Sequence, residues 1–337
     1  MDKAFTNYLI EERSYVSYIK REIHLEVSNA HFTETKVGQI DIIVAELTSN
    51  LIKHAGSGEI LYRTTNIGND STFEVICIDK GPGMADISRM MKDGVSTTQT
   101  LGQGLGAVER LSTFAQFYSL PKGGTIAYAV VSTQEEKFVR KTGLEVGVRA
   151  LCICKPRENV CGDGYGIKQT EDSVKIFFGD GLGHGEQAKA AVDAARNIFM
   201  ETESSEPSEI IRRIHEKVRR TRGLVIAIAV FDKKLSRWML CGVGNIMMRI
   251  YNGIEYKNYM SYNGTVGLNI PNSLNDSTFA AEKNQHLIMC SDGIRSRWDL
   301  NAYPSIFKYD CTVLAAALYR DFTRGNDDAS VLIAKVS

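Results

Sequence analysis

The stretch Val174-Lys175-Ile176-Phe177-Phe178-Gly179-Asp180-Gly181-Leu182-Gly183-His184-Gly185 is the most informative part of this chain. Its first residues are apolar and β-prone, which predicts a strand that leads into Asp180. Three other segments also place an Asp beside Gly or in a polar turn, and these are Gly162-Asp163, Ser291-Asp292-Gly293 and Asn326-Asp327-Asp328-Ala329-Ser330. Carboxylates at strand ends can converge, so we expect the four segments to build one acidic site.

The chemistry of such a site suits divalent cations. Mg²⁺ and Mn²⁺ prefer oxygen ligands and keep some of their water, and several aspartates with a glycine carbonyl supply such a shell. A single Asp-Gly pair is usually no more than a turn. Because four acidic segments recur here, the residues favour a two-metal hydrolase.

Length and charge limit the other classes of function. At 337 residues the chain exceeds the usual size of one core, so two domains are expected. Lys plus Arg equals Asp plus Glu at 40 each, which does not favour a nucleic-acid or anionic-membrane partner. No charged-then-apolar leader opens the chain, and no apolar run approaches the about 18 residues of a membrane span. We expect a cytoplasmic protein with reduced thiols.

The boundary between the two domains is expected in a polar segment. Residues 132–143 lack sustained periodicity and separate a glycine-punctuated α/β region from a second region rich in strands. The prediction is an N-terminal domain over residues 1–132, a linker over 133–143 and a C-terminal domain over 144–337.

The N-terminal half contains one strong helical pattern. Apolar residues recur three and four positions apart, at Val37, Ile40, Val44, Leu47 and Leu51. Glu46, Asn50 and either Lys53 or His54 share a different face of the same helix. These polar residues are either functional or part of a solvated helix face.

A strand and a glycine-rich loop follow that helix. The strand over residues 73–78 must end at Asp79, because Asp79-Lys80-Gly81-Pro82-Gly83 cannot continue it. A loop over residues 94–106 contains Thr97 and the alternate glycines Gly102, Gly104 and Gly106, and another helix begins at Ala107. Backbone N–H groups before a helix, with its positive end, suit a phosphate. Two final strands are separated by Gly123-Gly124.

The order of these pieces resembles the superfamily of gyrases, heat-shock chaperones, histidine kinases and mismatch-repair ATPases (GHKL). Within it, residues 91–111 look closest to the small serine kinases of bacterial partner-switching systems, also called switch or anti-sigma kinases. The resemblance covers about residues 1–132. It implies a Bergerat-type α/β sandwich that binds ATP and Mg²⁺.

The same resemblance implies a role for each matched residue. Asp79 would accept a hydrogen bond from the adenine amino group, and Gly81 and Gly83 would let the backbone approach the base. Asn50 would bind Mg²⁺ and Glu46 would activate the substrate hydroxyl. The remaining nucleotide-binding residues would be Thr97, Gly102, Gly104 and Gly106. Lys53 and His54 would contact phosphate or a partner, or simply end the helix.

The acidic segments of the C-terminal half resemble the metal-dependent protein phosphatases of the 2C type, in their bacterial sporulation and stress-response branch. The resemblance spans about residues 144–337. It implies a four-layer α/β-β/α sandwich in which two antiparallel sheets lie between helices. Segments 187–200 and 210–220 are the helix pair expected on one face.

This second resemblance implies two Mn²⁺ or Mg²⁺ ions. Asp180 would bridge them, the Gly181 carbonyl would bind one, and the shells would be completed by Asp163, Asp292 and one of Asp327 and Asp328. We favour Asp327, which lies three residues before Ser330. The two cations would lower the pKa of a shared water, so no phosphoenzyme is needed.

Two features of this second site stay open. His184 would protonate the leaving oxygen or contact the phosphate, or it would cap the following helix. No arginine precedes the first Asp as in many eukaryotic members, so the residue that contacts the substrate phosphate is unassigned.

Taken together, the two resemblances imply a bifunctional switch. A kinase would phosphorylate Ser or Thr on a STAS-domain anti-sigma-factor antagonist, and the fused phosphatase would remove the phosphate. A sigma factor or a sensor protein is a further candidate partner. In one alternative the first domain only binds nucleotide or sequesters a partner, and in another the second domain is an inactive structural unit.

Overall fold

The computed structural model describes residues 3–91, 104–134 and 144–337. The chain divides into two compact units. The first holds the N-terminal residues from Lys3 to Phe138 together with Asn301–Arg320, and the second holds Val139–Leu300 and Asp321–Ser337. The linker at 133–143 stays a prediction, because most of it lies outside the described residues. None of the described helices is long and apolar enough to cross a membrane.

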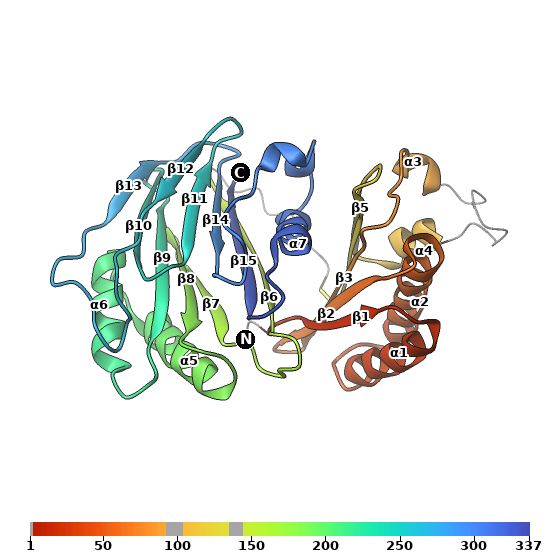
Figure 1. Cartoon of the computed structure of the whole chain (residues 1–337), viewed down its shortest axis with the longest axis horizontal. Helices are drawn as coiled ribbons and strands as arrows, with labels where there is room; N and C mark the ends of the chain where they lie inside the picture. The colour runs from red at the N-terminus through yellow and green to blue at the C-terminus, as the bar shows by residue number, and fades with distance from the viewer. Residues whose placement is uncertain (1–2, 92–103, 135–143) are drawn as a thin grey trace. The chain divides into compact units, whose positions relative to one another are not determined.

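The first unit is built on a five-stranded antiparallel sheet in the order β1-β2-β3-β5-β4. The strands are β1 (Thr6–Ile10), β2 (Gly58–Ile67), β3 (Asp70–Ile78), β4 (Phe114–Leu120) and β5 (Gly124–Ser132). The helices are α1 (Arg13–Ser28), α2 (Glu34–Asn50), α3 (Ile87–Met90), α4 (Gly104–Leu111) and, from the second segment, α7 (Cys311–Phe322) with the short η2 (Leu300–Ala302) and η3 (Ile306–Lys308). Figure 1 shows α1, α2 and α4 together on one face of this sheet.

Helix α2 follows directly from its sequence. The Thr33 side chain accepts a hydrogen bond from the Lys36 N–H and caps the helix start. Its buried stripe packs into one core with the inward face of the sheet, which confirms the predicted apolar face. After Asn50 the chain continues as the short π-helix η1 (Leu51–Ala55), which carries Lys53 and His54. Single π-helical turns often accompany functional sites.

Two of the predicted boundaries in the first unit are correct and one is wrong. Strand β3 ends at Ile78, directly before Asp79, and Gly123-Gly124 lies at the turn from β4 to β5 as predicted, with Gly124 as the first residue of β5. The helix expected to begin at Ala107 already begins at Gly104, so Gly104 and Gly106 are helical instead of lying in a loop. The missing Cβ of Gly104 allows this earlier start, because a carboxylate of α2 lies close above it.

The second unit contains two five-stranded antiparallel sheets, in the orders β13-β10-β9-β8-β7 and β12-β11-β14-β15-β6. The strands of the first sheet are β7 (Asp163–Gln169), β8 (Ser173–Gly181), β9 (Leu224–Asp232), β10 (Arg237–Val243) and β13 (Ser277–Ala280). Those of the second are β6 (Val146–Ile153), β11 (Met247–Tyr251), β12 (Tyr256–Tyr259), β14 (His286–Cys290) and β15 (Ala329–Val336).

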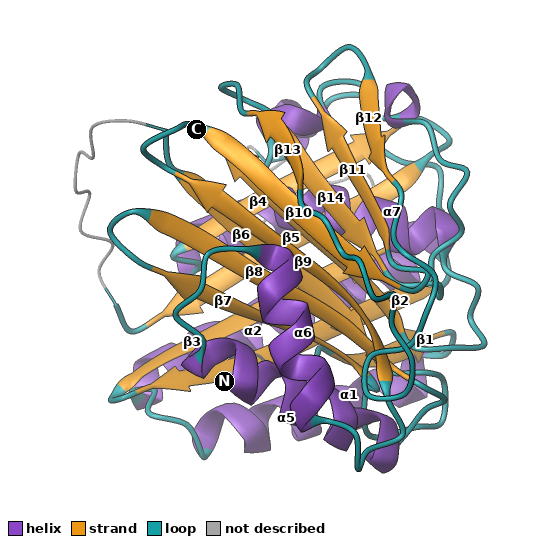
Figure 2. Ribbon diagram, turned by 90° about the vertical axis from the view of Figure 1, so that its left-hand side faces the viewer, coloured by secondary structure: helices purple, strands orange, loops and turns teal. Residues whose placement is uncertain are grey.

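Helices α5 (Glu186–Glu201) and α6 (Pro207–Lys217) cover the outer face of the first sheet, as Figures 1 and 2 show. This pair was predicted, but α6 ends at Lys217 and not at Arg220, and the three residues that follow belong to a turn. Strand β8 is covered on both faces and is buried along almost its whole length. That burial explains its unbroken apolar run. Helix α7, which lies between β14 and β15 in sequence, groups with the first unit up to Arg320, and its last two residues, Asp321 and Phe322, belong to the second unit.

Candidate active site

The predicted aspartates of the second unit lie at strand ends. Asp163 begins β7 and Asp180 lies next to the end of β8, and the two residues are direct partners in the β7–β8 pairing. Their side chains therefore lie on the same face of the sheet at the same end. The Gly181 N–H also donates to the Gly162 carbonyl at 3.2 Å, which continues the pairing to the residue before Asp163.

The second sheet supplies the other three carboxylates. Asp292 lies in the turn that follows β14, where the Ile294 N–H donates to the Ser291 carbonyl at 3.1 Å. Asp327 and Asp328 directly precede β15, the neighbour of β14. The Ser330 N–H donates to the Ser291 hydroxyl at 3.0 Å, so the two acidic turns are held together.

Asp328 connects the start of β15 to the loop after β6 and to the residue before β7. One of its carboxylate oxygens accepts from the Lys155 N–H at 2.7 Å, and the other accepts from the Gly162 N–H at 2.8 Å. Both oxygens are thus engaged by backbone donors. Asp327, in contrast, accepts only the short-range bond from the Asp328 N–H at 3.0 Å among the described residues. Asp328 therefore joins distant backbone segments, whereas the Asp327 carboxylate makes only a local hydrogen bond among the described residues.

Glycines allow these segments to approach. A Cβ at Gly181 would overlap the backbone of Ala188 in α5, and a Cβ at Gly293 would overlap the Asp328 carbonyl oxygen. At Gly162 a Cβ would lie 2.9 Å from the Asp328 carboxylate. The glycines next to the aspartates are therefore required by backbone packing, as well as by the turns they form.

The site is strongly acidic. Burial raises the pKa of Asp180 to about 9, and the like charges that add to the effect belong to Asp163, Asp292, Asp327 and Asp328. Burial likewise raises the pKa of Asp163 to about 7. The buried Oδ2 of Asp163 has no hydrogen-bond partner among the described residues. The carboxylates repel one another, and this repulsion would be relieved by a bound cation.

The carboxylates do not form a closed cluster among the described residues. Within residues 3–91, 104–134 and 144–337, no three Asp, Glu, His or Cys side chains come close enough to enclose a metal by themselves. At the rim, His184 Nδ1 lies 2.9 Å from Glu158 Oε1. Asn245 Nδ2 donates to Asp292 Oδ2 at 3.0 Å.

In the first unit the predicted residues form two groups. Asp79 Oδ1 accepts from the Gly81 N–H at 2.8 Å and from the Thr125 N–H at 3.1 Å, which fixes its carboxylate. Burial raises the pKa of Asp79 against the effect of these donors. Gly83 has a φ of +67° and packs against the Leu120 carbonyl. Only glycine adopts this conformation readily.

The second group lies where α2 meets α4. A Cβ on Gly104 would lie 3.2 Å from Glu46 Oε2, 3.6 Å from Asn50 Nδ2 and 3.7 Å from Asn50 Oδ1. Both polar side chains therefore point toward the start of α4, and Gly106 is buried one half-turn further on. Two other predicted residues, Thr97 and Gly102, lie outside the described residues.

A family model described as stage II sporulation protein E (SpoIIE) matches residues 170–337. The C-terminal half of the chain is a phosphatase domain of the SpoIIE and PP2C type. Three of the four acidic segments lie inside the match, and Asp163, the partner of Asp180, lies just before it.

Two curated relatives come from Bacillus subtilis (strain 168). The phosphoserine phosphatase RsbX is 23% identical over 141 residues, which is 42% of this chain and 70% of RsbX. The serine/threonine-protein kinase RsbT is 34% identical over 92 residues, which is 27% of this chain and 69% of RsbT.

Solved structures agree on the fold of the phosphatase domain. A structure described under the bacterial stressosome is 26% identical, with a TM-score of 0.52 over 57% of this chain and 99% of its own. The crystal structure of RsbX in complex with magnesium has a TM-score of 0.52 at 19% identity, over 59% of this chain and 98% of its own.

Sequence reasoning missed three polar residues at the rim of the phosphatase site, which are Glu158, Asn245 and Arg222. Asn245 carried a signal, because it ends a strand-turn segment that also contains two glycines. Glu158 carried none, since it lies in a polar loop whose contact with His184 depends on the fold.

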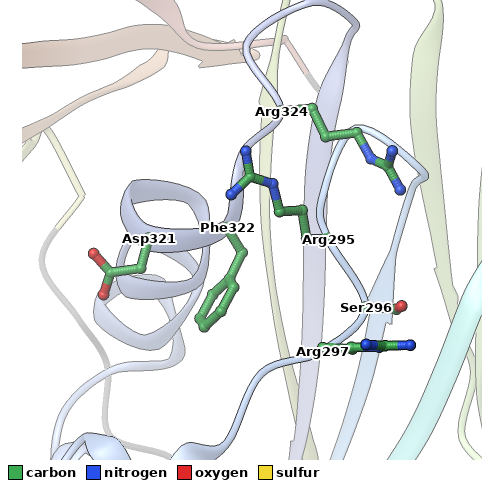
Figure 3. A pocket seen from close by; sticks show the side chains of 6 residues that line it. All are labelled: Arg295, Ser296, Arg297, Asp321, Phe322 and Arg324. Carbon is green, nitrogen blue, oxygen red and sulfur yellow. The ribbon is translucent and has the colours of Figure 1, made fainter.

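A surface hollow of the phosphatase domain lies beside the acidic turns and is lined by Arg295, Ser296, Arg297, Asp321, Phe322 and Arg324. Backbone hydrogen bonds hold its two walls together, from the Arg295 N–H to the Phe322 carbonyl and from the Arg324 N–H to the Gly293 carbonyl, both at 2.8 Å. Figure 3 shows the side chains of Arg295 and Arg324 pointing in different directions. The arginines of this hollow do not converge on one point.

Proposed function

We propose that this protein is a partner-switching regulator in which a metal-dependent phosphoserine/phosphothreonine phosphatase and an ATP-dependent serine/threonine kinase share one chain. The proposed substrate of both is a STAS-domain anti-sigma-factor antagonist. The phosphatase half is supported by one observation: Asp163 lies opposite Asp180 in the β7–β8 pairing, and aspartates from the three other acidic segments lie near enough to add to the raised pKa of Asp180.

The chemistry of these donors fits divalent cations. The oxygens are hard ligands, and a buried oxygen of Asp163 lacks a partner among the described residues. Burial, and then their like charges, raise the pKa of Asp163 and Asp180. We assign Asp163, Asp180, Asp292, Asp327 and the Gly181 carbonyl as ligands. When bound, two Mn²⁺ or Mg²⁺ ions would supply Lewis acidity and a water of lowered pKa. RsbX in a solved structure is in complex with magnesium.

Asp328 is better suited to a structural role. Both of its oxygens already accept backbone hydrogen bonds, so a cation would have to share them with Lys155 and Gly162. The assignment of Asp327 as the ligand therefore agrees with its position three residues before Ser330.

We assign His184 as the residue that gives a proton to the leaving serine oxygen. In hydrolysis a water oxygen forms a bond to phosphorus, the bond from phosphorus to the serine oxygen breaks, and that oxygen takes up a proton. His184 lies on the loop directly after Asp180-Gly181, and Glu158 holds its Nδ1 at 2.9 Å. A carboxylate partner of this kind accepts a hydrogen bond from Nδ1–H and fixes the ring, so the doubly protonated ring would carry a second proton on Nε2 and pass it to the serine oxygen.

The phosphatase is tested with a phosphoserine peptide and the full chain. We expect hydrolysis that needs Mn²⁺ or Mg²⁺ and that is abolished in Asp180→Asn. Asp172→Asn is the matched control, because Asp172 is exposed and pairs with Lys234 at 2.9 Å away from the acidic edge. Equal loss in both variants, or turnover in EDTA, would contradict the proposal.

The kinase half rests on the junction of α2 and α4. Glu46 and Asn50 lie together above Gly104. Asp79 presents a carboxylate that two backbone donors hold in place. The similarity to the kinase RsbT supports phosphate transfer, with Glu46 as the base, Asn50 as the Mg²⁺ ligand and Asp79 as the adenine acceptor.

The competing function is nucleotide binding without transfer, and one experiment separates the two. The Asp180→Ala variant, which cannot remove the product, is incubated with labelled ATP and a STAS-domain antagonist. We expect labelled antagonist, and we expect Glu46→Gln to abolish labelling while ATP still binds. Binding of ATP with no labelled protein in either form would favour the nucleotide-sensor function.

A further inference from the structure

We propose that Arg222 binds the phosphoryl group of the substrate in the phosphatase site. Two oxygens of the phosphoserine would accept hydrogen bonds from its guanidinium. This inference rests on the proposed phosphatase function and names a residue for the phosphate contact that the sequence left unassigned.

Arg222 lies on a short, well-held turn between α6 and β9. The Thr221 hydroxyl donates to the Val218 carbonyl at 2.7 Å and accepts from the Gly223 N–H at 3.1 Å. Gly223 has a φ of +84° and packs against Thr265 and Val266. The backbone on both sides of Arg222 is thus fixed, which limits where its side chain can reach.

That turn is directly bonded to the loop that follows Asp180. The Leu182 N–H donates to the Gly223 carbonyl at 3.1 Å, and Gly181 is the pairing partner of Leu224. The two segments run side by side, so the base of the Arg222 side chain lies next to the Asp180-to-His184 loop.

The guanidinium itself lies over Gly183. A Cβ built on Gly183 would be 3.1 Å from Nη2 and 3.2 Å from Nη1 of Arg222. Gly183 lies between Asp180 and His184, the residues assigned to cation binding and to the leaving group. A glycine at this position leaves space for the planar group at the rim of the site, as well as allowing a φ of +82°.

Among the described residues, no acidic partner takes up the positive charge of Arg222. Arg222 is exposed, and no ion pair or side-chain hydrogen bond engages its guanidinium in the part of the chain that the structure describes. A guanidinium offers paired N–H donors that match two phosphate oxygens, and so it suits a dianionic phosphoserine above an acidic site that would otherwise repel it.

The test uses the Mn²⁺-loaded full chain and three variants, Arg222→Gln, Arg222→Lys and the control Arg220→Gln. Arg220 is an exposed arginine two residues away. For Arg222→Gln we expect kcat/KM for a phosphoserine peptide to fall by roughly 10- to 100-fold. Inorganic phosphate, measured by calorimetry, should bind about tenfold more weakly, because the guanidinium contacts the phosphate group itself. Arg222→Lys should recover part of both, and Arg220→Gln should behave like the wild type.

The outcomes separate this inference from the function on which it rests. Unchanged phosphate binding in Arg222→Gln would overturn the inference, as would a matching loss of Mn²⁺ binding, which would mean that the arginine supports the fold of the site. Absence of turnover in the wild type would overturn the phosphatase proposal, while the phosphate titration would still decide the role of Arg222.

Discussion

Asp163 and Asp180 face each other across the β7–β8 pairing, although a cross-strand pair of like charges is normally destabilising. The burial and mutual charge of this pair raise the pKa values of Asp163 and Asp180 to about 7 and about 9. The fold therefore keeps an arrangement that costs stability in the absence of a counter-ion.

Because of this pair, we expect the metal-free protein to lose stability as the pH rises. Both carboxyl groups have raised pKa values in the folded state, so their contribution to stability is complete below about pH 4 and is lost as the pH rises to about 9. We expect the free energy of unfolding in EDTA to fall by several kcal/mol over this range, since one pKa unit corresponds to about 1.4 kcal/mol. Urea unfolding at a series of pH values measures it.

Two further measurements test whether Asp163 and Asp180 cause this pH dependence of stability. The Asp180→Asn variant should show a flatter pH dependence, and added Mn²⁺ should restore the stability of the wild type at high pH. A wild type whose stability in EDTA does not change between pH 5 and pH 9 would contradict the raised pKa values of Asp163 and Asp180.

The buried His286 makes the protein sensitive to acid. Burial, and then the charge of Lys335 opposite it on β15, lowers the pKa of His286 to about 4. The folded state holds the neutral ring, so stability is complete above about pH 6.5 and is lost toward pH 4, by up to roughly 3 kcal/mol. The His286→Gln variant should lose this dependence, whereas His31→Gln, at an exposed histidine, should keep it. Identical pH profiles for the three proteins would contradict the expectation.

Substitutions of the two adjacent aspartates before β15 should affect stability and metal binding separately. Asp328→Ala removes the acceptor of two backbone N–H groups, and we expect it to lower the free energy of unfolding by about 2–4 kcal/mol. Asp327→Ala removes no such acceptor and should weaken Mn²⁺ binding with a change in stability below about 1 kcal/mol. Thermal unfolding in EDTA and Mn²⁺ titration are the two measurements. The reverse pattern would exchange the roles of the two residues.

Gly104 offers a test of the N-terminal site with a matched control. A methyl group there would lie 3.2 Å from the Glu46 carboxylate, so Gly104→Ala should displace that side chain and reduce phosphate transfer at least tenfold, or about 1.4 kcal/mol. Gly38→Ala places the same methyl group on α2 with nothing within 4 Å. The Gly38→Ala variant should keep full transfer and gain about 0.5–1 kcal/mol of stability. A Gly104→Ala variant with undiminished transfer would show that this junction takes no part in it.

The parts of this protein that sequence predicts best are those governed by local pattern. The α2 stripe, the end of β3 before Asp79 and the helix pair α5 and α6 follow from periodicity and from glycine or proline signals. The position of each acidic segment next to a strand follows for the same reason.

The features that sequence did not predict depend on contacts between turns. Arg222 reaches Gly183, Glu158 reaches His184, and Asp328 engages backbone donors more than 160 positions earlier in the chain. No periodicity marks such contacts, because each depends on how two sheets and their loops come together. The early start of α4 at Gly104 is similar, since propensity disfavours glycine there and a Cβ at this position would lie only 3.2 Å from the Glu46 carboxylate.

The two backbone bonds to Asp328 also bear on how ions enter and leave. They tie the end of β6 and the start of β7 to the start of β15. The spacing between the acidic segments is thus set by hydrogen bonds of the protein itself, and a cation would enter a frame whose strand ends are already joined.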